Sequence, residues 1–196
     1  MVIDTAELAK NYLIYFILPL WVIVGIIDWF CHRAARIEYS AGPTESVIHL
    51  SMLCQAGVAI LFGLYFEING LIVLIMLLAW AAHEVTGYWD LAYANAHRRI
   101  TAVEQRVHDY LGVIPLLALS FVVVTHWPAF LSIFGLGGVS FDRSLQLRTP
   151  PVEPVYFWFL MAAMAINLLL YLQELYRGIK AVRGHAHPMH LAEHSR

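Results

Sequence analysis

The stretch that decides the fold is LIVLIMLLAWAAHEVTGYWD, residues 71–90. It begins with an unbroken apolar run, and about 20 largely apolar residues are enough for a helix to cross a bilayer. Toward its end the run reaches His83, Glu84 and Asp90, although ionisable side chains are costly inside a membrane. The stretch therefore predicts a transmembrane helix that carries a polar site near one end.

The whole chain has the composition of a membrane protein. Of its 196 residues, 60% are hydrophobic and only 13% are charged, and the mean hydropathy is +0.66. A water-soluble domain of this size is far less apolar. The formal charge is −2 and the basic residues are scattered, so no polybasic tract indicates a nucleic-acid partner. Cys31 and Cys54 lie in apolar runs, so neither a disulfide framework nor a thiolate zinc site is indicated.

Hydropathy divides the chain into five spans, so the predicted fold is an all-α integral membrane protein, a bundle of five transmembrane helices. The helices are expected at about 12–32, 44–66, 71–99, 104–127 and 155–178. Residues 1–182 form the transmembrane domain in this interpretation, and residues 183–196 form a His-rich tail. The second and third spans are joined by Glu67-Ile68-Asn69-Gly70, a turn signal that predicts a tight antiparallel hairpin.

The distribution of Lys and Arg predicts the orientation, because cytoplasmic loops carry the excess of these residues. The loops after the first and third spans share one side with the C-terminus, and this side holds Arg33, Arg36, Arg98, Arg99, Arg106, Arg177, Lys180, Arg183 and Arg196. The other side holds Lys10, Arg143 and Arg148. The sequence thus predicts a multi-pass protein of the inner cell membrane with its N-terminus outside and its C-terminus in the cytoplasm.

Acidic residues and histidines gather at the predicted cytoplasmic ends of the helices. Three acids each precede a histidine by four residues, a spacing that places both side chains on one helix face. The pairs are Asp28 and His32, Glu45 and His49, and Glu104 and His108. Random placement of the 14 acids and 10 histidines would give fewer than one such pair. Helix capping explains acids in a first turn, but it does not explain the histidines that follow them.

The third span contributes a different pattern. His83, Asp90 and His97 are seven residues apart, close to two helical turns, and so form one stripe. Imidazoles and carboxylates that converge from four helix ends suit a site for two metal ions. The predicted ligands are Asp28, His32, Glu45, His49, His83, Asp90, His97, Glu104 and His108, with Glu84 and Asp109 as catalytic or supporting acids.

This arrangement, spread over residues 28–109, resembles the integral-membrane dimetal oxygenases, meaning fatty acid desaturases, fatty acid hydroxylases and alkane hydroxylase. The resemblance is to the placement of ligands on helix ends, because the HxxHH motif of that family is absent here. It implies two iron ions, oxygen-dependent hydroxylation or desaturation of a hydrophobic or lipid substrate, and an electron-donor protein. Tyr88, Trp89 and Tyr110 are then candidates for the substrate pocket, although an interfacial aromatic belt explains them equally simply.

Three other functions stay open from the residues alone. A zinc or manganese site fits the same nitrogen and oxygen ligands, and zinc would favour a membrane hydrolase with Glu84 or Asp109 as the general base. A haem-binding electron carrier could use facing histidines such as His49 and His108, but haem does not need the acids. A transporter would be expected to place its ligands near the membrane midplane.

Overall fold

A computed structural model describes the backbone of residues 4–192 and the side chains of residues 4–184. All regular elements in this part of the chain are helices, and Phe66 and Leu147 form an isolated β-bridge. The elements are α1 (Thr5–Tyr12), the π-helical segment η1 (Leu13–Ile17), α2 (Leu18–Ala35), α3 (Ile37–Ser40), α4 (Pro43–Tyr65), α5 (Gly70–His97), α6 (Ala102–Thr125), α7 (Trp127–Ile133) and α8 (Pro154–Ala192).

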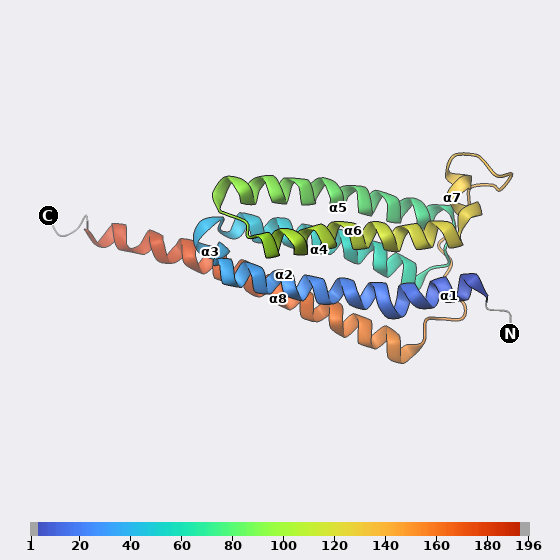
Figure 1. Cartoon of the computed structure of the whole chain (residues 1–196), viewed down its shortest axis with the longest axis horizontal. Coiled ribbons are helices and arrows are strands. Elements are labelled where there is room, and N and C mark those ends of the chain that lie inside the picture. Colours follow the sequence, from blue (N-terminus) through green and yellow to red (C-terminus); the bar gives the residue numbers. More distant parts are fainter. Residues whose placement is uncertain (1–3, 193–196) are drawn as a thin grey trace.

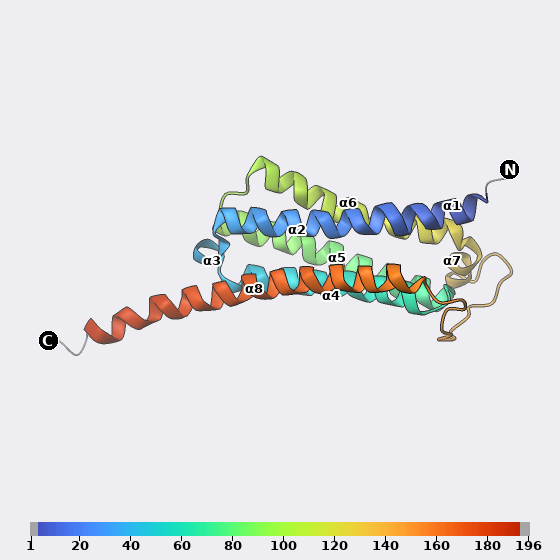
Figure 2. The same ribbon diagram turned by 90° about the horizontal axis from the view of Figure 1, so that it is seen from below.

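Five helices are long and apolar enough to cross a membrane, as the hydropathy predicts. They are the continuous unit of α1, η1 and α2, followed by α4, α5, α6 and α8. Figures 1 and 2 show them as a roughly parallel-axis bundle. Each helix packs against two neighbours in the order α2, α6, α5, α4, α8 and back to α2, so the five helices form a closed ring. A ring of this kind encloses a central lumen.

Polar turns lie at the end of the bundle near α7. Asn69 caps α5 by accepting a hydrogen bond from the backbone N–H of Ile72 at 3.1 Å, in the short turn that joins α4 to α5. The segment between α7 and α8 returns to this turn, where the backbone N–H of Arg148 donates to the carbonyl of Tyr65 at 2.9 Å. The opposite end is where α3 and the far part of α8 lie (Figure 1). The polar cluster described below is at this end.

Helix α8 extends beyond the bundle in both views (Figures 1 and 2). It continues to Ala192, where the sequence predicts a helix end near residue 178, so the first part of the predicted tail is helical. Residues 193–196 of that tail lie outside the described residues. Two glycines allow α8 to lie close to its neighbours α2 and α4. A Cβ on Gly25 would lie 2.7 Å from Asn167 Oδ1, and a Cβ on Gly178 would lie 3.0 Å from Pro43 Cα.

Candidate metal centre

Acids and histidines from all five spanning helices meet inside one end of the bundle. They are Asp28 and His32 from α2, Glu45 and His49 from α4, Asp90 from α5, Glu104 and His108 from α6, and Glu174 from α8. All of them are buried except His108, which is partly buried. We call these eight residues the acid–histidine cluster. Seven of them are ligands predicted from the sequence, and Glu174 is an addition.

The first group of ligand atoms in the cluster belongs to Asp28, His32 and His108, and these atoms all lie within 4.8 Å of one another. Asp28 Oδ1 lies 3.2 Å from His108 Nε2, and Asp28 Oδ2 lies 3.4 Å from His32 Nε2. Two atoms bound to one ion at about 2.1 Å are at most about 4.2 Å apart. Small side-chain shifts would therefore bring this group to coordination distance.

The second group contains His32, Glu45 and His49, with ligand atoms again within 4.8 Å of one another. The rings of His32 and His49 are stacked, with centroids 4.3 Å apart and an interplanar angle of 8°. Asp90 joins this side of the cluster, because its Oδ1 lies 3.1 Å from His49 Nε2. The two groups share His32, so together they describe adjacent sites rather than separate ones.

Glu174 was not predicted from the sequence, yet it lies between the two stacked imidazoles. Its Oε2 is 3.0 Å from His32 Nδ1 and its Oε1 is 2.8 Å from His49 Nδ1. Each imidazole can thus donate its Nδ1 proton to Glu174, which leaves each Nε2 free to accept a metal ion. The close approach of α8 at Gly178, four residues later, brings Glu174 into this position.

Arg98 is the permanent cation of the cluster, and it lies outside the spans in the turn between α5 and α6. Its guanidinium donates to Glu45 Oε1 at 2.5 Å and to Glu104 Oε1 at 2.6 Å, and its Nε also contacts Glu45. Partial burial alone would lower the pKa of Arg98. The hydrogen bonds and negative charges of Glu45 and Glu104 outweigh this effect and raise that pKa above its ordinary value.

The charges of the cluster do not balance within the described part of the chain. Five carboxylates face one guanidinium, so with neutral imidazoles the formal charge is five negative minus one positive, or −4. Burying uncompensated charge in a low-dielectric interior is strongly unfavourable. The donor set therefore suits cations of high charge, and two divalent ions would offset it completely.

Buried nitrogen and oxygen atoms of the cluster meet one another without well-aligned hydrogen bonds. Asp28 Oδ1 lies 3.2 Å from His108 Nε2, and Asp90 Oδ1 lies 3.1 Å from His49 Nε2. Within the described part of the chain, however, Asp28 Oδ1, His32 Nε2, His49 Nε2 and Asp90 Oδ1 form no hydrogen bond of good geometry. All four atoms are of the types that bind metal ions, and they come from three different helices. The residues present therefore fit a metal group at this position.

Two of the predicted ligands, His83 and His97, lie outside the acid–histidine cluster. His83 is buried, but its Nδ1 lies 3.2 Å from the carbonyl oxygen of Met52. His97 is exposed and stacks on Tyr93, with ring centroids 4.1 Å apart. Seven residues of helix correspond to about 10 Å of axial rise, so a centre at Asp90 is one such step away from each of these histidines. Of the predicted stripe of His83, Asp90 and His97, only Asp90 belongs to the cluster.

The predicted supporting acids occupy a different place from the ligands. Glu84 and Asp109 are exposed residues. Both line a cavity, described below, that leads to the cluster. Asp109 accepts a hydrogen bond from Gln105 at 3.1 Å and pairs with Arg106 at 3.4 Å. Among the described residues, neither acid forms an ion pair or hydrogen bond with a histidine of the cluster.

Helix capping explains part of the role of one cluster acid, Glu104. Glu104 forms a capping box with Thr101 at the start of α6, and its other oxygen faces Arg98 and lies 3.8 Å from His32 Nε2. The N-cap residue of α4 is Gly42, and the carboxylate oxygens of Glu45 accept hydrogen bonds from Arg98. Thus Glu104 serves both the helix end and the cluster, whereas Glu45 serves the cluster alone.

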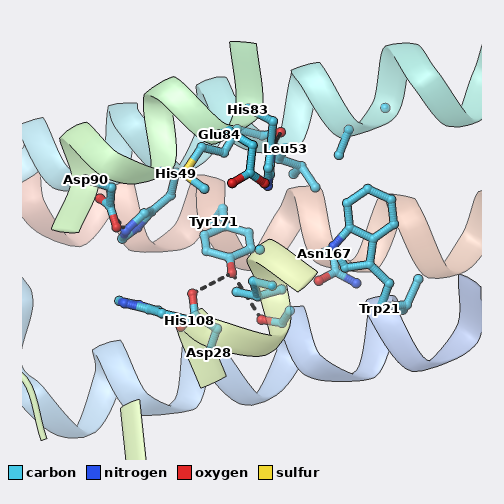
Figure 3. A pocket seen from close by; sticks show the side chains of 18 of the residues that line it. Trp21, Asp28, His49, Leu53, His83, Glu84, Asp90, His108, Asn167 and Tyr171 are labelled. Carbon is cyan, nitrogen blue, oxygen red and sulfur yellow. Dashed lines mark hydrogen bonds and ion pairs between the residues drawn. The ribbon is translucent and has the colours of Figure 1, made fainter. Parts of the chain in front are cut away.

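A cavity of about 340 Å³ extends from the cluster into the lumen (Figure 3). All five spanning helices contribute to its wall, which is mostly apolar. Asp28, His49, Asp90 and His108 lie at one end of it, and Trp21 and Asn167 lie at the other (Figure 3). The cavity therefore connects the polar cluster with an apolar space.

Tyr171 forms part of the boundary between the cavity and the cluster. It is buried, and its hydroxyl lies 3.0 Å from Asp28 Oδ2 and 3.1 Å from the carbonyl oxygen of Gly25 (Figure 3). Like Glu174, it comes from α8 and was not predicted. Donation of its proton to Asp28 fixes the orientation of that carboxylate.

The three aromatic pocket candidates are all exposed on the outside of the ring. Tyr88 is 79% exposed, Trp89 57% and Tyr110 53%. Tyr88 also borders the cavity, but Trp89 and Tyr110 are not among the residues that line it. Their exposure is what an interfacial aromatic belt would give.

Comparisons with protein-family models, with curated proteins and with solved structures found no match.

Proposed function

We propose that the acid–histidine cluster holds two metal ions and that the protein is a membrane-embedded oxidoreductase. The observation that carries the proposal is the largely buried group of five carboxylates and three imidazoles, with Arg98 as the one guanidinium that contacts it among the described residues. Asp28, His32 and His108 would hold one ion, and Glu45 and His49 the other, with Asp90 beside His49. Glu174 would orient the two stacked imidazoles.

The ligand types support iron more than copper(I), because they are imidazoles and carboxylates without thiolates. Two bound iron ions would supply oxygen activation for the hydroxylation or desaturation of a hydrophobic or lipid substrate. The apolar cavity supports this choice, since it would hold such a substrate next to the cluster and exclude water. Arg98 would fix Glu45 and Glu104, and Tyr171 would fix Asp28. The reaction also needs electrons, for which we propose a donor protein as partner.

A single-turnover experiment tests this function. The purified chain is loaded with ferrous iron without oxygen, mixed with membrane lipids, and then exposed to oxygen. We expect lipid products that have gained one oxygen atom or lost two hydrogen atoms, detected by mass spectrometry. Lipids that stay unchanged with iron-loaded protein would contradict an oxidative function.

A zinc-dependent hydrolase is the second candidate, and one observation favours it. Glu84 and Asp109 line the cavity that leads to the cluster, where a general base would be needed. Hydrolysed lipids from zinc-loaded protein, formed without oxygen, would select this candidate. A haem protein is less well supported, because His32 lies flat against His49 and five acids surround the histidines.

We further propose that the N-terminus lies outside and that the cluster faces the cytoplasm across the inner cell membrane. The support is the asymmetry of nine against three Lys and Arg residues between the two sides. A periplasmic reporter enzyme inserted near Asp142 should then be active, and the same reporter fused after Arg196 should be inactive. The reverse result would invert the orientation and move the cluster to the outer side.

A further inference from the structure

A second cavity continues the first one along the lumen. Its volume is about 660 Å³, and its wall includes residues of α1, η1 and α2, the cluster-distal parts of α4, α5 and α6, and the segment that leads into α8. The two cavities share a short partition formed by Leu18, Trp21, Ala56, Ile60 and His83. They therefore lie end to end, separated only by these side chains.

Trp21 is the main element of the partition. Its ring meets the ring of His83 edge to face, with centroids 6.3 Å apart. Trp21 belongs to α2 and His83 to α5, and these two helices are not neighbours in the ring. The contact therefore crosses the lumen and narrows it at one point.

The combined dimensions of the lumen suit an extended chain. On α4 the wall runs from His49 in the first cavity to Leu64 in the second, which corresponds to about 22 Å of axial rise. This is roughly two-thirds of the hydrocarbon thickness of a bilayer, about 30 Å. The space extends along the helix axes, so an extended hydrocarbon chain could lie in it.

The two ends of the lumen differ in character. We call the first cavity, next to the cluster, the inner cavity and the second one the outer cavity. The end of the outer cavity away from the cluster, which we call its mouth, includes the ionisable side chains of Lys10, Glu67, Arg148 and Glu153. Between this mouth and the partition the wall contains apolar residues such as Met76, Ala118 and Leu119. An amphiphile could therefore keep its polar head at the mouth while its chain extends toward the cluster.

We propose that the lumen binds one single-chain amphiphile, with its head at the outer mouth and its methyl end directed past Trp21 toward the cluster. Trp21 then determines specificity, because it limits how far the chain reaches into the inner cavity. This names the substrate class of the function proposed above, and it rests on that function only for the chemistry at the inner end.

Photolabelling tests whether the chain of an amphiphile passes Trp21 toward the cluster, which we call the passage. The result does not depend on metal chemistry at the cluster. The probe is a long-chain fatty alcohol that carries a diazirine at its methyl end, added to the full chain in nanodiscs. Peptide mass spectrometry then separates labels near Met52, Leu53 and Met164, which line only the inner cavity, from labels near Met76 and Ala118, which line only the outer one. Wild-type protein should be labelled mainly on the outer set, with a smaller fraction on the inner set.

Two substitutions should change this ratio in opposite directions. Trp21→Ala removes the narrowing and should raise inner labelling several-fold, whereas Ala56→Phe fills the partition and should abolish it. Trp158→Ala is the matched control, because Trp158 is 69% exposed on α8 and lines neither cavity. If Trp21→Ala does not fold, Trp21→Phe should show a smaller increase. Labelling that is absent from the lumen, or a ratio unchanged by Ala56→Phe, would overturn the proposal.

Metal content measured on the same samples separates the two proposals. A chain that binds metal but is never labelled in the lumen would reject the passage alone. A chain with the predicted labelling pattern but no metal binding would reject the proposed function and leave the passage standing.

Discussion

Replacing Arg98 by alanine is expected to lower the free energy of unfolding by about 3–5 kcal/mol, the usual cost of removing one partner from a buried ion pair. Arg98 contacts two carboxylates that are almost fully buried, Glu45 and Glu104. Without the guanidinium these carboxylates would face each other with no permanent cation between them. Denaturant or thermal unfolding of the purified protein in detergent measures the effect.

Arg106→Ala is the matched control for this experiment. Arg106 lies on the same helix as Glu104, but its ion pair with Asp109 is exposed, with 70% exposure of the Arg106 side chain. Exposed pairs contribute about 0–1 kcal/mol. Arg98→Lys should fall between the two, because an ammonium cannot contact both carboxylates with the same geometry. Equal stability of the Arg98→Ala and Arg106→Ala variants would contradict the role of Arg98.

The second large effect is expected on metal binding. His49→Ala and His108→Ala each remove a nitrogen ligand from the cluster, and Glu174→Ala removes the group that orients His32 and His49. Loss of an orienting residue typically lowers metal affinity by about 10–100-fold, and loss of a ligand should cost at least as much. Equilibrium dialysis against iron, zinc or manganese measures the affinity of each variant.

His126→Ala serves as the control for these variants. His126 lies outside the spans at the end of α6, far along the bundle from the cluster, and hydrogen-bonds locally to Thr125 and the carbonyl of Val122. Its removal should leave metal affinity unchanged. An equal loss in His126→Ala and His49→Ala would mean that the measured metal is not bound by the cluster.

The sequence predicts the spans and most of the cluster because both depend on local spacing. An acid four residues before a histidine lies on the same helix face whatever the tertiary structure, so the pair Asp28 and His32 faces inward as a unit. Apolar runs of sufficient length likewise identify membrane helices without knowledge of their packing.

Glu174 and Arg98 were not predicted as parts of the site, because contacts between distant segments place them there and local spacing does not encode such contacts. Glu174 has no histidine partner on its own helix, and its role comes from the approach of α8 to α4 at Gly178. The available signal was its acidic side chain near the end of an apolar span, which is costly unless it has a partner. Arg98 was counted only as a cytoplasmic charge, because nothing local indicates that the turn after α5 directs it inward.

The position of His83 apart from the cluster has a simple geometric cause. A shared helix face does not imply a shared site, because seven residues separate side chains by about 10 Å along the axis. Asp90 lies beside His49 in the cluster, whereas His83 meets Trp21 at the partition of the lumen.

Metal stoichiometry is the most direct test of the central claim. Metal-free protein is titrated with ferrous iron, zinc or manganese, and the bound metal per chain is measured at saturation for the wild type and for the Asp28→Ala, His49→Ala double variant. The charge and the two overlapping ligand groups predict about two ions per wild-type chain, and little or none in the double variant. Saturation of both proteins at the same level, or no binding by the folded wild type, would contradict a metal centre in this cluster.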